Sequence, residues 1–120
     1  MIQEDKDLLL RDLSSRLLYK VVAQVSYKDG EGWKTEDRKV LGVYTDEQVY
    51  VDGVYTDIEN TKPYLRPMSS MTKEEKDAYD TLTMCNASWV VVDWLNAHHF
   101  DYRGLIEKGI ALEAPEGMYN

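Results

Sequence analysis

The stretch Gln48-Val49-Tyr50-Val51-Asp52-Gly53-Val54-Tyr55-Thr56-Asp57 decides the fold, because it holds the strongest hairpin signal in the chain. An Asp-Gly pair between two runs of β-branched and aromatic residues is typical of a two-residue turn with positive φ at both positions. Such a turn pairs Tyr50 with Tyr55 and Val51 with Val54. It also places four side chains on the face that we expect to be buried: Val49, Val51, Val54 and Thr56.

Further short strands are predicted on both sides of this hairpin. From Lys20 the pattern alternates, which predicts a strand with Val21, Ala23 and Val25 on its buried face. Residues 28–37 are polar and hold two glycines, so we expect a loop there, followed by a second strand over 38–44. After one helical turn at 58–61, the prolines at 63 and 67 restrict the segment between them to a short edge strand.

Helices are predicted on either side of these strands. Leu9, Leu13 and Leu17 recur at the helical spacing, which predicts an N-terminal helix. Thr72 and Glu75 have the spacing of a capping box, which predicts a helix from Lys73 to about Thr83.

The rest of the C-terminal half predicts two more helices. An apolar stripe of helical period runs along residues 87–98, although the β-branched residues leave a strand open over Ser88–Val92. A short third helix is expected at Tyr102–Lys108, capped by Asp101 and stopped by Gly109. We expect residues 110–112 to pack back on the body and order to end at Pro115.

This order of elements predicts an α+β protein. It consists of an N-terminal helix, a small antiparallel curved sheet or barrel, and a C-terminal group of two to three helices. The order of the strands and the single helical turn resembles a Src-homology-3-like barrel, an analogy of fold and not of function. We expect residues 1–67 to form the helix and barrel, and residues 68–120 to pack on them as one domain, since 120 residues suffice for one core.

Charge and cysteine content exclude several classes of protein. With 14 basic and 22 acidic residues the net charge is −8, and no basic stripe exists, so we expect neither direct nucleic-acid binding nor membrane binding. The single cysteine, Cys85, excludes an internal disulfide and favours a reducing compartment, and we expect its thiol to be packed. The acidic N-terminus and the short apolar runs predict a soluble cytoplasmic protein.

Residues 96–103 hold the densest group of chemically active side chains. Adjacent histidines on a helix project about 100° apart, so His98 and His99 do not readily share one metal ion. His98 and Asp101, at i and i+3, could share one, but a structural zinc site would still lack two ligands. We therefore predict no metal site, no cofactor and no catalytic residue.

Two interpretations of this segment remain open. In the first it is a structural hinge, where a histidine binds the carbonyls at the end of the preceding helix and Phe100 fills the gap between helices. In the second it is an exposed patch that binds a protein partner. The candidate interaction residues are Trp33, His98, His99, Asp101 and Arg103.

The exposed-looking aromatic residues of the sheet also have two interpretations. Trp33 either recognises a partner from its loop or covers its own core. Tyr50 and Tyr55 are expected to pack against the C-terminal helices.

Two stretches carry a resemblance: Pro63-Tyr64-Leu65-Arg66-Pro67-Met68-Ser69-Ser70-Met71-Thr72, and Trp94-Leu95-Asn96-Ala97-His98-His99-Phe100-Asp101-Tyr102-Arg103-Gly104-Leu105-Ile106. With the tail Glu113-Ala114-Pro115-Glu116-Gly117-Met118-Tyr119, they resemble a family of short uncharacterised proteins from gut Bacteroidales genomes and their phages. The resemblance covers residues 48–120. It implies a gut bacterium or its prophage as the setting, and it implies no catalytic residues.

The sequence thus favours a non-enzymatic protein-interaction or regulatory module, whose partner and oligomeric state it does not identify. One alternative is an acidic decoy that occupies a nucleic-acid-binding host protein. The other is a small hydrolase or metal-dependent enzyme.

Overall fold

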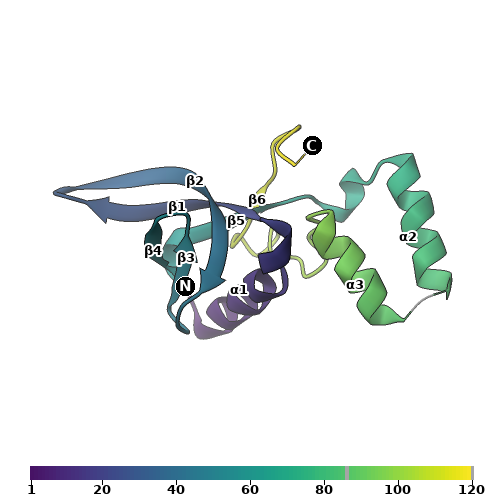
Figure 1. The fold of residues 1–120 in the computed structure, drawn as a ribbon, viewed down its shortest axis with the longest axis horizontal. Coiled ribbons are helices and arrows are strands. Elements are labelled where there is room, and N and C mark those ends of the chain that lie inside the picture. Colours follow the sequence, from purple (N-terminus) through teal and green to yellow (C-terminus); the bar gives the residue numbers. More distant parts are fainter. Residues whose placement is uncertain (86, 120) are drawn as a thin grey trace.

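The computed structural model describes residues 1–85 and 87–119, and it confirms the predicted α+β class (Figure 1). The elements follow in the order α1 (Gln3–Ser15), η1 (Leu17–Tyr19), β1 (Val22–Asp29), β2 (Gly32–Val43), β3 (Gln48–Val51), β4 (Val54–Asp57), η2 (Ile58–Asn60), β5 (Thr61–Leu65), η3 (Met68–Ser70), α2 (Lys73–Cys85), α3 (Ser88–Ala97) and β6 (Leu112–Glu113). The strands form one curved sheet in the order β4-β3-β2-β1-β5-β6. All neighbouring strands are antiparallel except β5 and β6.

The β3–β4 hairpin has the predicted register, in which Tyr50 pairs with Tyr55 and Val51 with Val54. Val49 and Val51 are fully buried on its inner face. Only Gly53 in the turn has a positive φ, of 85°, so the expectation of two such residues is wrong.

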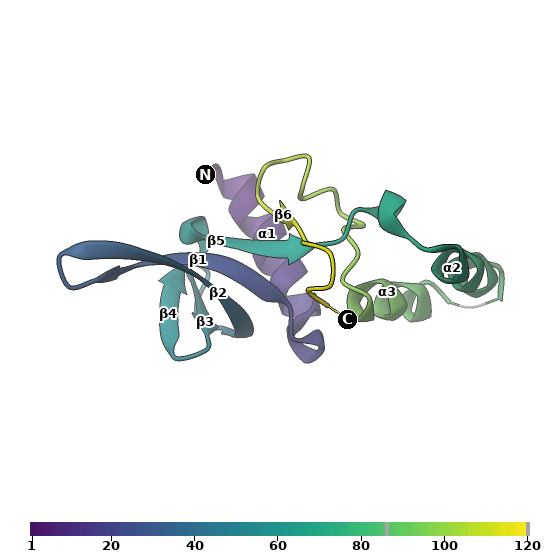
Figure 2. The same ribbon diagram turned by 90° about the horizontal axis from the view of Figure 1, so that it is seen from above.

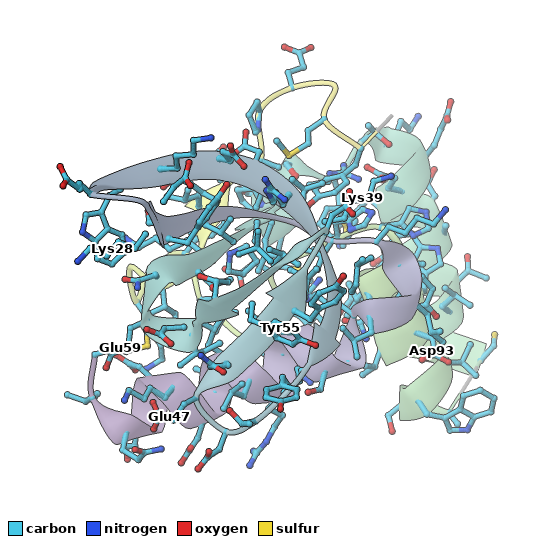
Figure 3. The ribbon with its side chains drawn as sticks, turned by 60° about the vertical axis from the view of Figure 1, so that its left-hand side comes forward. Lys28, Lys39, Glu47, Tyr55, Glu59 and Asp93 are labelled. Carbon is cyan, nitrogen blue, oxygen red and sulfur yellow. The ribbon has the colours of Figure 1, made fainter. Side chains whose placement is uncertain are left out.

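The outer face of this hairpin carries an aromatic cluster. Tyr55 lies 4.9 Å from Tyr50 and 4.9 Å from Tyr44, measured between ring centroids, and it projects from the sheet (Figure 3). Figures 1 and 2 place β3 and β4 at the opposite end of the molecule from α2 and α3. The expectation that Tyr50 and Tyr55 pack on the C-terminal helices is therefore wrong.

Residues 28–37 are not a loop, because β1 and β2 pair without interruption as far as Asp29 and Gly32. Polar cross-strand contacts hold the pair together: the Ser26 and Thr35 hydroxyls are 3.0 Å apart, and Lys34 lies 3.1 Å from Asp29. The hairpin projects beyond the rest of the sheet (Figure 2), and residues 28–35 are exposed on both of its faces, which accounts for the polar composition. Trp33 lies on β2 with 63% of its surface exposed, so it does not cover the core.

The prediction of an edge strand around Pro63 is also wrong, because β5 lies between β1 and β6. Pro63 pairs with Ala23 of β1. The short β6 pairs only with Tyr64 and Leu65, beyond the proline, so the missing amide of Pro63 interrupts no pairing there.

The core lies between α1 and the concave side of the sheet. Leu9 and Leu13 of α1 are fully buried, as are the predicted Val21, Ala23 and Val25. The second half of the chain contributes to the same cluster through Leu105, Ile110 and Ala111.

The C-terminal half contains two of its three predicted helices. The structure settles residues 88–92 as helix, within α3. Residues 102–109 form turns, because Gly104 has a φ of 75° and interrupts the helical path. Asp101 still accepts hydrogen bonds from the amides of Leu105 and Ile106, both at 2.9 Å, in the manner of a cap.

Two smaller expectations about this half are wrong. The thiol of Cys85 is exposed at the end of α2 instead of packed. Order does not end at Pro115, because residues 116–119 form a turn against the body. Within the described part of the chain, no helix has the length and apolar content needed to cross a membrane.

We predict that Phe100→Ala lowers the free energy of unfolding by about 3–5 kcal/mol. The ring is fully buried, 5.8 Å from the Trp94 ring and beneath the Arg66 guanidinium, so truncation leaves a cavity. Urea denaturation measures the change. Leu18→Ala is the control, because Leu18 is 87% exposed and should change stability by less than about 0.5 kcal/mol. Equal effects of the two substitutions would contradict the packing.

Candidate functional site

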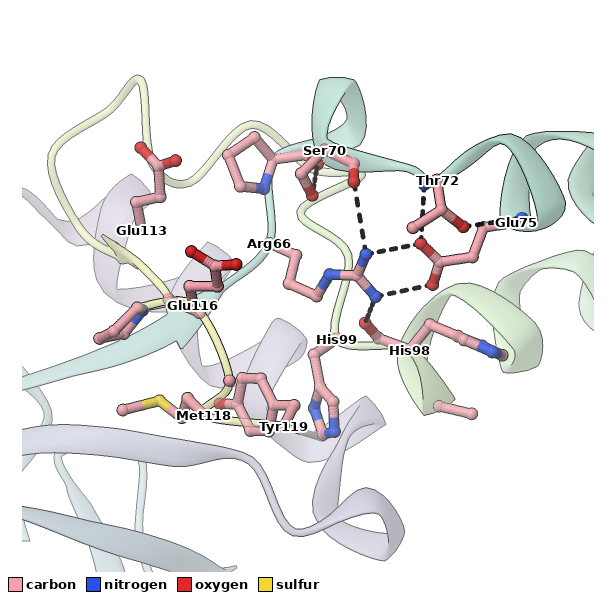
Figure 4. A pocket seen from close by; sticks show the side chains of 15 residues that line it. Arg66, Ser70, Thr72, Glu75, His98, His99, Glu113, Glu116, Met118 and Tyr119 are labelled. Atoms are coloured by element: carbon pink, nitrogen blue, oxygen red, sulfur yellow. Dashed lines mark hydrogen bonds and ion pairs between the residues drawn. The ribbon is translucent and has the colours of Figure 1, made fainter.

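A polar cavity of about 710 Å³ lies between the C-terminal strap, defined as residues 113–119, and the adjoining ends of α2 and α3 (Figure 4). Arg66 and Glu75 line one wall, and His98 and His99 line another. The strap forms the remaining side.

The Arg66–Glu75 pair fixes the wall at the start of α2. The two guanidinium nitrogens of Arg66 donate to the two carboxylate oxygens of Glu75 at 2.8 and 2.6 Å (Figure 4). Glu75 also accepts a hydrogen bond from the Thr72 amide at 2.9 Å and donates its own amide to the Thr72 hydroxyl at 3.1 Å, which confirms the predicted capping box. The neighbouring guanidinium lowers the pKa of Glu75 to about 2, so the carboxylate stays charged.

The side chain of His98 bonds to the backbone at the C-terminal end of α3. Its Nδ1 lies 2.9 Å from the Trp94 carbonyl, and its ring stacks on the Trp94 indole with centroids 4.2 Å apart. The prediction that a histidine binds the carbonyls at the end of this helix is confirmed.

His99 is the strained residue of the cavity. Its φ of 63° lies in the left-handed region, and only 9% of its surface is exposed. Its Nδ1 has no hydrogen-bond partner among the described residues. Burial, followed by the nearby Arg16 and Arg66 charges, lowers the pKa of His99 to about 4, so the ring is neutral at pH 7.

Tyr119 anchors the strap over His99. The two rings stack with centroids 3.6 Å apart. The Tyr119 hydroxyl donates to the Tyr64 carbonyl at 2.7 Å and accepts from the Val22 amide at 3.0 Å. Burial raises the pKa of Tyr119 to about 12, so the hydroxyl keeps its proton.

A buried ionic network lies behind the cavity. Asp12 and Arg16 of α1 are both fully buried, with Arg16 Nε 2.8 Å from Asp12 Oδ2. Arg16 also donates to the Phe100 carbonyl at 2.7 Å, and Arg103 donates to Asp12 Oδ1 at 2.8 Å. These bonds join α1 directly to the segment that follows α3.

The structure therefore separates the predicted interaction residues. It brings His98 and His99 to the cavity wall and directs Asp101 and Arg103 into contacts within the molecule. It places Trp33 on the distant β1–β2 hairpin. Arg66 and Tyr119 were not predicted as site residues, because only the folded contacts give a signal for them.

A second feature, which sequence analysis also missed, is an incompletely buried helix. Seven of the ten residues of α3 are apolar, yet only Leu95 and Asn96 are buried, and none of the residues described in α2 is. Trp89 and Met84 are 68% and 84% exposed near the turn between these helices. The predicted apolar stripe did not include Trp89, which lies to one side of it.

Comparisons with models of protein families, with curated proteins and with solved structures found no match to this chain. The resemblance of residues 48–120 to the Bacteroidales family stays a prediction. Among the residues that the structure describes, no group of three or more His, Cys, Asp or Glu side chains is arranged to hold a metal ion.

We predict that stability falls by about 2 kcal/mol between pH 7 and pH 5, because unfolded His99 binds a proton near pH 6.5 and the folded residue only near pH 4. The stabilisation is thus complete above pH 6.5 and is lost as the pH falls toward 4. Glu75 contributes little in this range, because its pKa is about 2 when folded and 4.5 when unfolded, so its carboxylate is mostly charged in both states above pH 5. Urea denaturation at each pH measures the slope.

The matched variants for this prediction are His99→Asn and His98→Asn. Asparagine tolerates the positive φ at position 99 and does not titrate, so the first variant should flatten the slope. The second should keep it. An unchanged slope in His99→Asn would show that another group titrates.

Proposed function

We propose that this protein is a non-enzymatic protein-interaction module, and that it binds its partner through the exposed side of the α2–α3 helical hairpin. The hairpin projects from one end of the molecule, away from the sheet (Figure 1). We name its binding surface the hairpin flank, which consists of Trp89, Val92 and Asp93 on one side of α3.

The incomplete burial of α3 is the observation that supports this proposal. A helix as apolar as α3 normally gains its stability from a covered face, and here α2 covers it poorly. Exposed apolar groups of this kind mark interaction sites, and tryptophan is among the residues that contribute most to binding energy.

The polar cavity supports a binding role better than a catalytic one. Its strongest charges neutralise each other in the Arg66–Glu75 pair, and His98 is held by a backbone carbonyl. The one cysteine, Cys85, ends α2, whereas the histidines follow α3 at the other end of the helical hairpin, so its thiol has no histidine base beside it. We propose a cytoplasmic role in a gut bacterium or its prophage, in line with the resemblance and the single cysteine.

We predict that Trp89→Asp weakens partner binding while leaving the fold intact, because the substitution replaces the largest apolar side chain of the hairpin flank with a charge. Wild-type and variant proteins are immobilised and exposed to extract of a native host. A protein captured by wild type is then purified and titrated against both. The expected result is a loss of affinity of at least about tenfold in the variant.

Trp33→Asp is the matched control, because Trp33 is 63% exposed and Trp89 is 68% exposed. This control should bind the purified partner like wild type. A partner that binds both variants equally, or turnover in an activity screen without any partner, would overturn the proposal.

A further inference from the structure

We infer that the partner presents a basic amphipathic helix to the hairpin flank, with apolar side chains on Trp89 and Val92 and a lysine or arginine opposite Asp93. This inference rests on the proposed function and adds the chemistry of the partner. Two observations support it: the acidic charge of the hairpin, which is complementary to a basic partner, and the spacing of the exposed residues on α3.

The spacing of the three residues gives the flank its mixed character. Trp89, Val92 and Asp93 stand at i, i+3 and i+4 of α3, so they share one side of the helix. Trp89 and Asp93 are exposed and Val92 is half-buried. The flank therefore combines an apolar surface with a carboxylate one helical turn away.

Asp93 is available to a partner. Its carboxylate makes no hydrogen bond or ion pair within the described residues, unlike Asp80, which lies 3.0 Å from Lys76. A partner cation beside the flank would gain a contact that α2 does not supply. A carboxylate in the same place would meet repulsion.

The charge of the whole hairpin also favours a basic partner. Residues 73–97 hold two lysines against five carboxylates, of which Glu75 is paired with Arg66, so the hairpin keeps an excess of negative charge, and the whole chain has a net charge of −8. A second copy of this chain would bring two acidic hairpins together, which costs energy through like-charge repulsion. A basic segment of another protein is favoured at the same site.

A helix fits the length of the flank. From Trp89 to Asp93 the exposed side of α3 is about 6 Å long at 1.5 Å per residue, which matches about one turn of an opposing helix. Asn96, the next residue on this side, is buried and donates to the Ser15 carbonyl at 3.3 Å. Helices that dock in this way use apolar anchors at i, i+3, i+4 and i+7, with charged residues beside them.

Two synthetic 18-residue helical peptides test the inference. Both carry the same stripe of leucines, and one has lysines beside the stripe where the other has glutamates. Their binding to the full chain is measured by fluorescence anisotropy at low and physiological salt. We expect the lysine peptide to bind at least about tenfold tighter than the glutamate peptide, with a smaller ratio at higher salt.

Substitutions in the chain show which surface the lysine peptide contacts. Trp89→Ala should weaken the lysine peptide about tenfold or more, and Asp93→Lys should reduce its advantage about threefold or more. The controls are Trp33→Ala and Asp46→Lys, because Trp33 and Asp46 are exposed residues outside the hairpin. Both controls should bind like wild type.

The other outcomes separate the two proposals. Equal binding of both peptides that depends on Trp89 would overturn the basic partner and leave the interaction surface standing. Binding that ignores Trp89 would overturn both. A wild-type dimer in sedimentation that becomes monomeric in Trp89→Ala would make a second copy the occupant, and would overturn the basic partner.

Discussion

The buried ion pair between Asp12 and Arg16 is the constraint on which the rest of the structure depends. Moving two charges out of water costs several kcal/mol each unless good geometry and further hydrogen bonds compensate. Arg103 and the Phe100 carbonyl supply those bonds. Since both come from the segment after α3, these bonds form only when that segment lies against α1. Arg16 Nη1 has no hydrogen-bond partner among the described residues.

This requirement fixes the C-terminal end of α3 against the body. The segment at 98–101 is held from the other side as well, because the backbone of Arg66 bonds to the His99 carbonyl at 2.7 Å and to the Asp101 amide at 2.8 Å. The side chain of Arg66 then binds Glu75 and so orients the start of α2. The two helices are thus attached to the body at one end, and their other end projects away from it (Figure 1). Trp89, in the first turn of α3, is exposed.

The sequence was informative wherever a local rule decides the structure. The turn at Gly53 set the register of its hairpin, the Thr72–Glu75 spacing set the start of α2, and periodicity identified α3.

Sequence patterns were misleading in two segments, and they gave no signal where contacts between distant parts of the chain decide the structure. Residues 28–37 look like a loop because a hairpin beyond the core needs no apolar face, and the turn after Asp101 looks helical until Gly104 takes a positive φ. The Asp12–Arg16 pair, at i and i+4, looks like an ordinary surface pair, so neither its burial nor its link to Arg103 was predictable. The cavity could not be predicted either, because its walls come from three separate parts of the chain.

A double-mutant cycle between Asp12 and Arg103 tests the central claim most directly. The free energy of unfolding is measured for wild type, Asp12→Asn, Arg103→Met and the double variant. If the ionic network joins α1 to the segment after α3, the two substitutions are non-additive by about 1–3 kcal/mol. Effects that add to within about 0.5 kcal/mol would show that Asp12 and Arg103 act independently, and would contradict the account.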